Sequence, residues 1–164
     1  MTLLTFMQLF LRVSCIMLNR VTAGFGTWVV YCDGSAMPNP GRMGMGAVLT
    51  EPNGVRHTLS RAADTKGCNN EAELRALMAA LGELQLRGAT ELIVFCDNSV
   101  VVEQLVGTAV KPIARLAPVF EEARVLLRSF GSASLRWIPR HRNTEADVLA
   151  RAALGLPAKR SSKH

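Results

Sequence analysis

The sequence predicts a single α/β domain, in which a mixed five-stranded sheet carries helices on its faces. Short apolar runs rich in β-branched residues alternate with longer segments of helical periodicity, in the order β-β-β-α-β-α-α-β-α. This order combines a strand hairpin with strand–helix–strand units, which is typical of an α/β sheet rather than of a bundle or a sandwich. The 164 residues are enough for one domain with a proper hydrophobic core.

The first half of the domain contains three strands before any long helix. The turn-rich segment 38–41 separates the first two strands, and the hairpin signal at 51–54 separates the second from the third. Glycines at positions 44 and 46 allow another part of the backbone to approach the second strand closely. The predicted strands are Thr27–Asp33, Met43–Thr50 and Val55–Arg61.

The second half alternates helices with two further strands. Asn70 is expected to cap a long helix with an apolar stripe at helical spacing, and Gly88 is expected to end it. The strand after this helix should run parallel to the first strand, because a helix connects the two. The predicted elements are a helix at Asn70–Arg87, a strand at Glu91–Asp97, helices at Ser99–Val106 and Ile113–Phe130 (despite Pro118), a strand at Ser134–Ile138 and a last helix at Asn143–Leu154.

The two ends of the chain differ from the domain between them. Residues 1–25 form an apolar extension, but its first basic residue, Arg12, lies inside the apolar stretch, unlike in a secretory signal. Gln8 and Arg12 also leave the stretch too short to span a membrane. We expect an extension that the domain can dispense with, Met17 being an alternative first residue, and an organellar transit peptide is the alternative. The domain is then residues 26–155, followed by a short basic tail at 156–164, in a cytoplasmic protein.

Composition narrows the function classes only slightly. Nineteen Lys and Arg residues against 13 Asp and Glu give a net charge of +6, which is compatible with a polyanionic partner. The four cysteines show no C-x-x-C spacing, so neither a zinc site nor a disulfide framework is indicated. Cys32 and Cys96 each precede an aspartate, and alternation along a strand predicts buried thiols on the face opposite the carboxylates. The glycine-rich stretch 41–46 has no nucleotide-binding spacing and leads into a strand, so we expect no organic cofactor.

Four acidic residues lie where strands end or helices begin. Asp33 and Asp97 directly follow apolar β-branched runs, whereas Glu73 and Asp147 fall in the first turns of predicted helices. A carboxylate at the end of a core strand must be solvated, paired or bound to a metal, because a bare buried charge is costly. If the first and fourth strands are neighbours, the four groups converge, and a hard cation such as Mg²⁺ would relieve their repulsion. Each acid alone could equally be a helix cap or a solvated strand end.

These motifs together resemble type 1 ribonuclease H over roughly residues 26–154. They are Asp33-Gly34-Ser35, Asn69-Asn70-Glu71-Ala72-Glu73, Asp97 after a strand, and Asn143-Thr144-Glu145-Ala146-Asp147. The resemblance implies the ribonuclease H fold and an endonuclease that cuts the RNA strand of RNA–DNA hybrids with two Mg²⁺ ions, for which Mn²⁺ can substitute. It assigns the metal-binding carboxylates to Asp33, Glu73, Asp97 and Asp147, and it implies products with 5′-phosphate and 3′-hydroxyl ends.

The resemblance also implies contacts with the hybrid and one further catalytic residue. His141 is expected to be an accessory group that relays protons or helps the product leave; an exposed loop residue is the alternative. No extra helix is predicted between Val106 and Ile113, so this is a compact form that lacks the basic protrusion of some members. The expected nucleic-acid contacts are Gly34, Ser35, Asn39, Asn69, Asn70, Arg140 and Arg142.

Two other functions fit the same sequence. A hybrid-binding module without catalysis would share the fold, but it would be free to lose the acidic positions, all four of which are acidic here. A nuclease of this fold that acts on another nucleic acid is the second alternative, against which the Asn69-Asn70 pair weakly favours a hybrid. In each case the partner is a nucleic acid, with no membrane involved, and we expect a monomer.

Overall fold

The order of elements along the chain is the predicted one, and the five strands form one sheet in the order β3-β2-β1-β4-β5. The computed structural model describes residues 26–109 and 111–159. Two short 3₁₀ turns, η1 and η2, were not predicted. The elements are β1 (Thr27–Met37), β2 (Gly41–Thr50), β3 (Arg56–Gly67), α2 (Asn69–Leu86), β4 (Glu91–Cys96), α3 (Ser99–Val106), η1 (Ala114–Leu116), α4 (Ala117–Arg128), β5 (Ser132–Trp137), η2 (Arg140–Arg142) and α5 (Thr144–Ala152).

The first three strands are longer than predicted. β1 continues beyond Asp33 because its antiparallel pairing with β2 extends to the pair Met37–Arg42. β3 runs to Gly67 rather than Arg61, since β2 pairs with it along its whole length, with an irregularity between Arg42 and Gly44. Asp33 therefore lies inside a strand. It follows the last residue of β1 that pairs with β4, because the parallel ladder ends at Cys32 and Cys96.

The boundaries of α2, α3 and α5 lie within two residues of the predicted ones, whereas α4 begins four residues later than predicted, after the 3₁₀ turn η1. The prediction that Asn70 caps α2 was wrong: Cys68 is the N-cap residue, and Asn69 is already helical. Pro118 does not interrupt a helix, because α4 begins only at Ala117 and places the proline in its first turn, where a missing N–H costs nothing. Gly88, with φ of 72°, ends α2 as expected.

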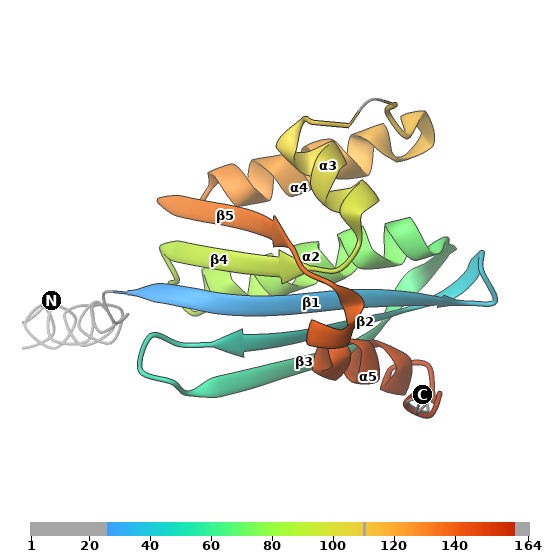
Figure 1. Ribbon diagram of the computed structural model, residues 1–164, viewed down its shortest axis with the longest axis horizontal. Coiled ribbons are helices and arrows are strands. Elements are labelled where there is room, and N and C mark those ends of the chain that lie inside the picture. Colours follow the sequence, from blue (N-terminus) through green and yellow to red (C-terminus); the bar gives the residue numbers. More distant parts are fainter. Residues whose placement is uncertain (1–25, 110, 160–164) are drawn as a thin grey trace, which may run out of the picture.

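Helices cover both faces of the sheet, and glycines set how closely they approach (Figure 1). A Cβ atom on Gly34 of β1 would lie 2.1 Å from the backbone of Ala72, so α2 packs directly against this face. On the opposite face, a Cβ on Gly44 or Gly46 of β2 would lie 2.1 or 2.3 Å from carbonyl oxygens of α5. These contacts hold the beginning of α2 against one face of the sheet and α5, from Ala146 to Ala150, against the other.

The main hydrophobic core lies between α2 and the sheet. Four predicted stripe residues of α2, namely Leu74, Leu77, Leu81 and Leu84, are fully buried against apolar side chains of β1, β2 and β4. The thiols of Cys32 and Cys96 are buried in this core, as the alternation of the strands predicted. In the described ranges, no helix is both long and apolar enough to cross a bilayer. The predicted extension at 1–25 and the last part of the basic tail, 160–164, lie outside the described residues.

Candidate metal centre and nucleic-acid interface

Three of the four predicted carboxylates meet where the parallel ladder between β1 and β4 ends. Asp33 follows the last paired residue of β1, Asp97 follows the last residue of β4, and α2 delivers Glu73 from the face below. One carboxylate oxygen from each residue lies within 4.8 Å of the other two. Because β4 stops at Cys96, no neighbouring strand covers β1 at this point on that side. Acids from two strands and one helix therefore meet in the space at the end of the ladder.

Burial and mutual repulsion hold protons on this cluster. The three residues are between 3% and 9% exposed. Burial, followed by repulsion from Asp97, raises the pKa of Asp33 to about 7. Burial is also the largest cause that raises the pKa of Glu73 well above its ordinary value, and a hydrogen bond with Asp33 adds to it. Protons therefore compensate part of the charge that the cluster would otherwise carry.

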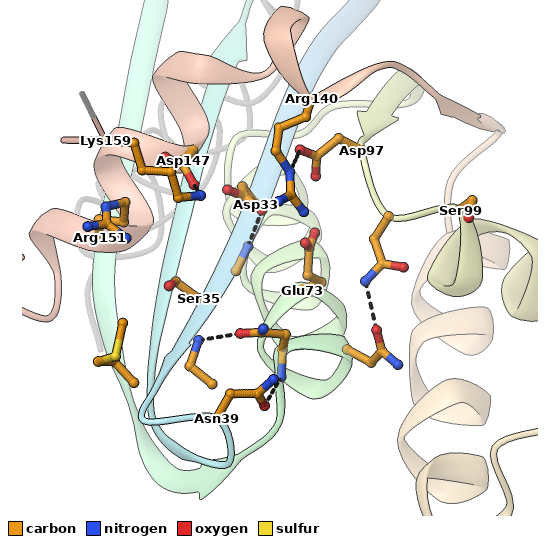
Figure 2. A pocket seen from close by; sticks show the side chains of 16 residues that line it. Asp33, Ser35, Asn39, Glu73, Asp97, Ser99, Arg140, Asp147, Arg151 and Lys159 are labelled. Atoms are coloured by element: carbon orange, nitrogen blue, oxygen red, sulfur yellow. Dashed lines mark hydrogen bonds and ion pairs between the residues drawn. The ribbon is translucent and has the colours of Figure 1, made fainter. Parts of the chain in front are cut away.

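Two basic side chains compensate part of the remaining charge (Figure 2). Arg140 Nε lies 3.3 Å from Asp97 Oδ2, and Lys159 Nζ lies 2.6 Å from Asp147 Oδ1. Burial acts against the charged form of Arg140, but the nearby carboxylates, Asp97 first among them, together raise the pKa of the guanidinium. Asp147 stands beside the three-carboxylate cluster, close enough that its charge contributes to the raised pKa of Asp33.

Side chains outside the motif acids fix the positions of Asp97 and Asp147. Asn143 is 2% exposed, and its Nδ2 donates to the carbonyl of Cys32 at 2.9 Å, which ties the start of α5 to β1 beside Asp33. The backbone N–H of Asp147 in turn donates to the carbonyl of Asn143. Trp137 Nε1 donates to the carbonyl of Asp97 at 3.2 Å. These positioning roles of Asn143 and Trp137 were not predicted from the sequence, because their side-chain hydrogen bonds depend on the tertiary fold.

The carboxylates fit a divalent cation. Asp97 Oδ1 is buried and has no hydrogen-bond partner within the described residues. An acceptor in that position is costly unless a donor or a cation reaches it. Oxygen ligands that are all carboxylates suit a hard cation such as Mg²⁺ better than zinc, which favours Cys and His ligands. The donor set therefore agrees with the magnesium site that the sequence predicts.

An open groove of about 600 Å³ passes over these acids and carries polar side chains along its floor (Figure 2). Ala36 N donates to Asn69 Oδ1, the N–H of Asn69 donates to Asn39 Oδ1, and Asn98 Nδ2 donates to Asn70 Oδ1. These bonds use the amide oxygens. The side-chain NH₂ groups of Asn39, Asn69 and Asn70 are then left as donors in the groove. The groove is lined by Asp33, Gly34, Ser35, Ala36, Met37, Asn39, Asn69, Asn70, Glu73, Asp97, Asn98, Ser99, Arg140, Asp147, Arg151 and Lys159.

Two predicted site residues lie elsewhere. Arg142 lines a second hollow, between Tyr31 of β1 and the start of α5, rather than the groove. His141 is exposed on η2 and is not among the described residues that line the groove. The groove also contains Asn98, Arg151 and Lys159, which were not predicted; of these, only Lys159 carried a signal in the sequence, as part of a basic segment.

The predicted position of Cys96, on the face opposite the aspartate that follows it, is confirmed, but its thiol has a partner among the four acids that was not predicted. Its thiol does lie on the face opposite Asp97, as alternation requires, but it donates to Glu73 Oε2 at 3.6 Å. Glu73 reaches the cluster from α2, which packs on the face that carries the thiols. Strand alternation could not show this, because it describes only residues of the strand itself.

The raised carboxyl pKa values predict how pH affects the stability of the metal-free protein. The pKa of Asp33 is about 7 in the folded protein, against an ordinary value of 3.8. At a pH between these two values, the folded protein keeps a proton on Asp33 that the unfolded chain has lost. The free energy of unfolding should therefore fall as pH rises through this window, and Glu73 should act in the same direction. Melting temperatures with a chelator at about pH 5 and about pH 8, for wild type and for Asp33→Asn, would measure the effect.

The Asp33→Asn variant lacks the carboxyl group that titrates at this position. It therefore serves as the reference for the effect of pH on stability that comes from other groups. The stability of wild type relative to this variant should decline with rising pH, and Mg²⁺ should reduce the decline. A difference that stays constant across the window would contradict the raised pKa of Asp33.

Comparison with known sequences supports the assignment of this fold. The family described as reverse transcriptase-like matches residues 31–153, a range that includes all four acids. Among curated proteins, the bifunctional protein Rv2228c of Mycobacterium tuberculosis is 37% identical over 131 residues. The matched segment is 79% of this chain and 36% of that protein, so the chain spans about a third of the length of this relative.

Solved structures match over the same region. RNase H1 from the halophilic archaeon Halobacterium salinarum NRC-1 superposes with a TM-score of 0.74 at 32% identity, over 79% of this chain and 98% of that one. LC11-RNase H1, isolated from compost and solved in complex with an RNA/DNA hybrid, gives a TM-score of 0.71 at 30% identity, over 78% of this chain and 96% of that one. Both similarities extend over almost the whole of the matched structures.

Proposed function

The chain belongs to the reverse transcriptase-like family, with ribonucleases H among its relatives, and from this membership we propose that it hydrolyses the RNA strand of RNA–DNA hybrids. The observation that carries the proposal is the buried cluster of Asp33, Glu73 and Asp97 on the floor of a polar groove. The complex of LC11-RNase H1 with an RNA/DNA hybrid supports the choice of substrate.

The acids are proposed to hold two Mg²⁺ ions, or Mn²⁺ in their place, through Asp33, Glu73, Asp97 and Asp147. Bound there, the ions would supply an activated water and neutralise the charge that develops on the scissile phosphate and on the leaving 3′ oxygen. Asn143 and Trp137 hold Asp147 and Asp97 in place. This chemistry gives 5′-phosphate and 3′-hydroxyl ends.

The groove supplies groups that can recognise the hybrid. The amide donors of Asn39, Asn69 and Asn70 suit the acceptors of a minor groove, and a 2′-hydroxyl that accepts from them distinguishes RNA from DNA. Gly34 and Ser35 line the same groove and are proposed to contact the hybrid there, and Arg140, with a side chain 71% exposed, is available to a backbone phosphate. Arg142, which lines the second hollow and not the groove, is proposed as a weaker contact to a backbone phosphate. The protein is proposed to act as a monomer in the cytoplasm and without an organic cofactor.

A cleavage assay on matched substrates tests the proposed function. With Mg²⁺, we expect cleavage of the RNA strand of an RNA–DNA hybrid and little or none of double-stranded RNA, double-stranded DNA or single strands of the same sequence. Cleavage should stop with a chelator and resume with added Mg²⁺ or Mn²⁺. Binding of the hybrid without cleavage would instead identify a binding module, and preferential cleavage of DNA would identify a nuclease with another substrate.

His141 remains a proposed accessory group on the exposed turn η2. Histidine is the side chain whose unperturbed pKa suits proton transfer near neutral pH, and this residue lies next to Arg140, which lines the groove. His141→Ala should lower the turnover number by a factor of about 10 to 100, at the lower end of general acid–base effects, with little change in hybrid affinity. His57→Ala is the matched control, since His57 lies on β3 and outside the groove. Equal turnover numbers for wild type and His141→Ala would leave His141 without a catalytic role.

A further inference from the structure

The chain after α5 turns back and returns to the metal centre. α5 ends at Ala152, and Gly155, with φ of 71°, adopts the left-handed conformation that reverses the chain. The N–H of Leu156 donates to the carbonyl of Arg151, and Arg151 Nε donates to the carbonyl of Pro157 at 2.8 Å. Three consecutive features therefore direct the following residues back along α5. We refer to residues 156–159 as the return segment.

The return segment ends on one of the four acids. Lys159 Nζ lies 2.6 Å from Asp147 Oδ1, twelve residues earlier in the chain. The Asp147 side chain is 14% exposed and that of Lys159 is 50% exposed, so the ammonium group covers a largely buried carboxylate from the solvent side. Lys159 and Asp147 both line the groove, and Figure 2 shows them beside Asp33.

The four acids therefore divide into two unlike sets. Asp33, Glu73 and Asp97 converge within 4.8 Å, and a buried oxygen of Asp97 has no partner in the described part of the chain. Both sets have a basic partner, but the contacts differ: Arg140 lies 3.3 Å from Asp97 Oδ2 and leaves Oδ1 of that residue free, whereas Lys159 lies 2.6 Å from Asp147 Oδ1. A divalent ion that enters the first set meets one carboxylate oxygen, Asp97 Oδ1, that has no donor among the described residues. An ion that uses Asp147 must first displace an ammonium group.

We propose that the return segment is a working part of the metal centre, in which the Lys159 ammonium occupies the place of the second divalent ion at Asp147 and competes with it. The inference rests on the proposed two-ion function and deepens it. The first ion binds at Asp33, Glu73 and Asp97 independently of the return segment. The second binds only as Lys159 withdraws, so the segment sets the concentration of metal at which the centre is complete.

The test is a calorimetric titration of the full-length, metal-free protein with Mn²⁺, in the absence of nucleic acid. Lys159→Ala should tighten the weaker of two binding events by up to roughly fivefold, the upper end of the range expected when a partly exposed ion pair is removed, and should leave the tighter event unchanged. Arg151→Leu, which frees Pro157 while keeping Lys159, should act in the same direction with a smaller effect. Lys111→Ala removes one positive charge from an exposed position between α3 and α4 and should change neither event.

A double-mutant cycle separates direct competition from a general charge effect. In the Asp147→Asn background, where the ion pair with Lys159 is absent, the substitution Lys159→Ala should no longer alter the weaker event. The proposal is overturned if Lys159→Ala titrates like wild type, if it tightens both events equally, or if its effect persists without Asp147. A second ion too weak to detect in both wild type and Lys159→Ala also overturns it, because removal of a competitor must expose the site. Hybrid cleavage is measured separately: a protein that binds ions as described but leaves the hybrid intact refutes the proposed function and not this inference.

Discussion

Asp97→Asn should fold like wild type and lose at least about a thousandfold of its cleavage rate on an RNA–DNA hybrid. The amide is almost the same size as the carboxylate, but it cannot supply the negative charge that holds a divalent ion. Asp97 contributes to the electrostatic repulsion that raises the pKa of Asp33. Because the substitution removes this repulsion, it should not lower the melting temperature. The variant should still bind the hybrid, because the amide donors of the groove are unchanged.

The measurement is single-turnover cleavage at saturating Mg²⁺, together with hybrid affinity and the thermal unfolding curve. Asp64→Asn is the matched control, since Asp64 is exposed on β3 and lies outside the groove. It should cleave at the wild-type rate. Wild-type turnover by Asp97→Asn would refute the assignment of the metal centre, whereas a loss of both folding and binding would show that Asp97 acts through stability.

Gly34→Ala should destabilise the protein by about 3 kcal/mol or more, a large effect for the addition of one methyl group. The new Cβ would lie 2.1 Å from the carbonyl carbon of Ala72 and 2.2 Å from the backbone nitrogen of Glu73. Both are backbone atoms near the start of α2, so relief requires the helix to move away from β1. That movement would carry Glu73 away from Asp33 and Asp97, and cleavage by the folded fraction should fall as well.

Gly82→Ala provides the opposite result from the same chemical change. Gly82 lies within α2, and its added Cβ would meet nothing within 4 Å among the described residues. Alanine is the better helix former, so this variant should gain about 0.5–1 kcal/mol and keep full activity. Chemical denaturation of the two variants gives both values. A Gly34→Ala protein as stable as wild type would mean that α2 does not pack on β1 as closely as described.

The fold could be predicted from the sequence wherever the local residue pattern determines the conformation, and not where a neighbouring element determines it. The leucines of α2 repeat at helical spacing, and Gly88 marks its end, so this helix was predicted within one residue. The second half of β3, residues 61–67, is mostly exposed and has neither alternation nor a β-branched run. It is a strand because β2 lies beside it, which is a tertiary effect that no local pattern contains.

The same distinction applies to the candidate site. Each acid belongs to a short motif at the start or end of an element, so all four could be named from sequence and three are brought into direct proximity. The contact of Lys159 with Asp147 depends on a chain reversal at Gly155, and the thiol of Cys96 touches Glu73 only because α2 packs on that face. Such partners come from different elements, and a single sequence shows neither their distance nor their orientation.

The hydrogen bond from Asn143 to the carbonyl of Cys32 joins residues 111 apart in the chain, and this separation has a consequence for biosynthesis. A ribosome delivers β1, α2 and β4 well before α5, so a nascent chain can assemble Asp33, Glu73 and Asp97 while Asp147 is still missing. Under the proposed mechanism such a chain binds one ion and cuts nothing. Catalytic competence is then acquired only after α5 has been synthesised and docks on β1, and this timing follows from topology without a separate inhibitor.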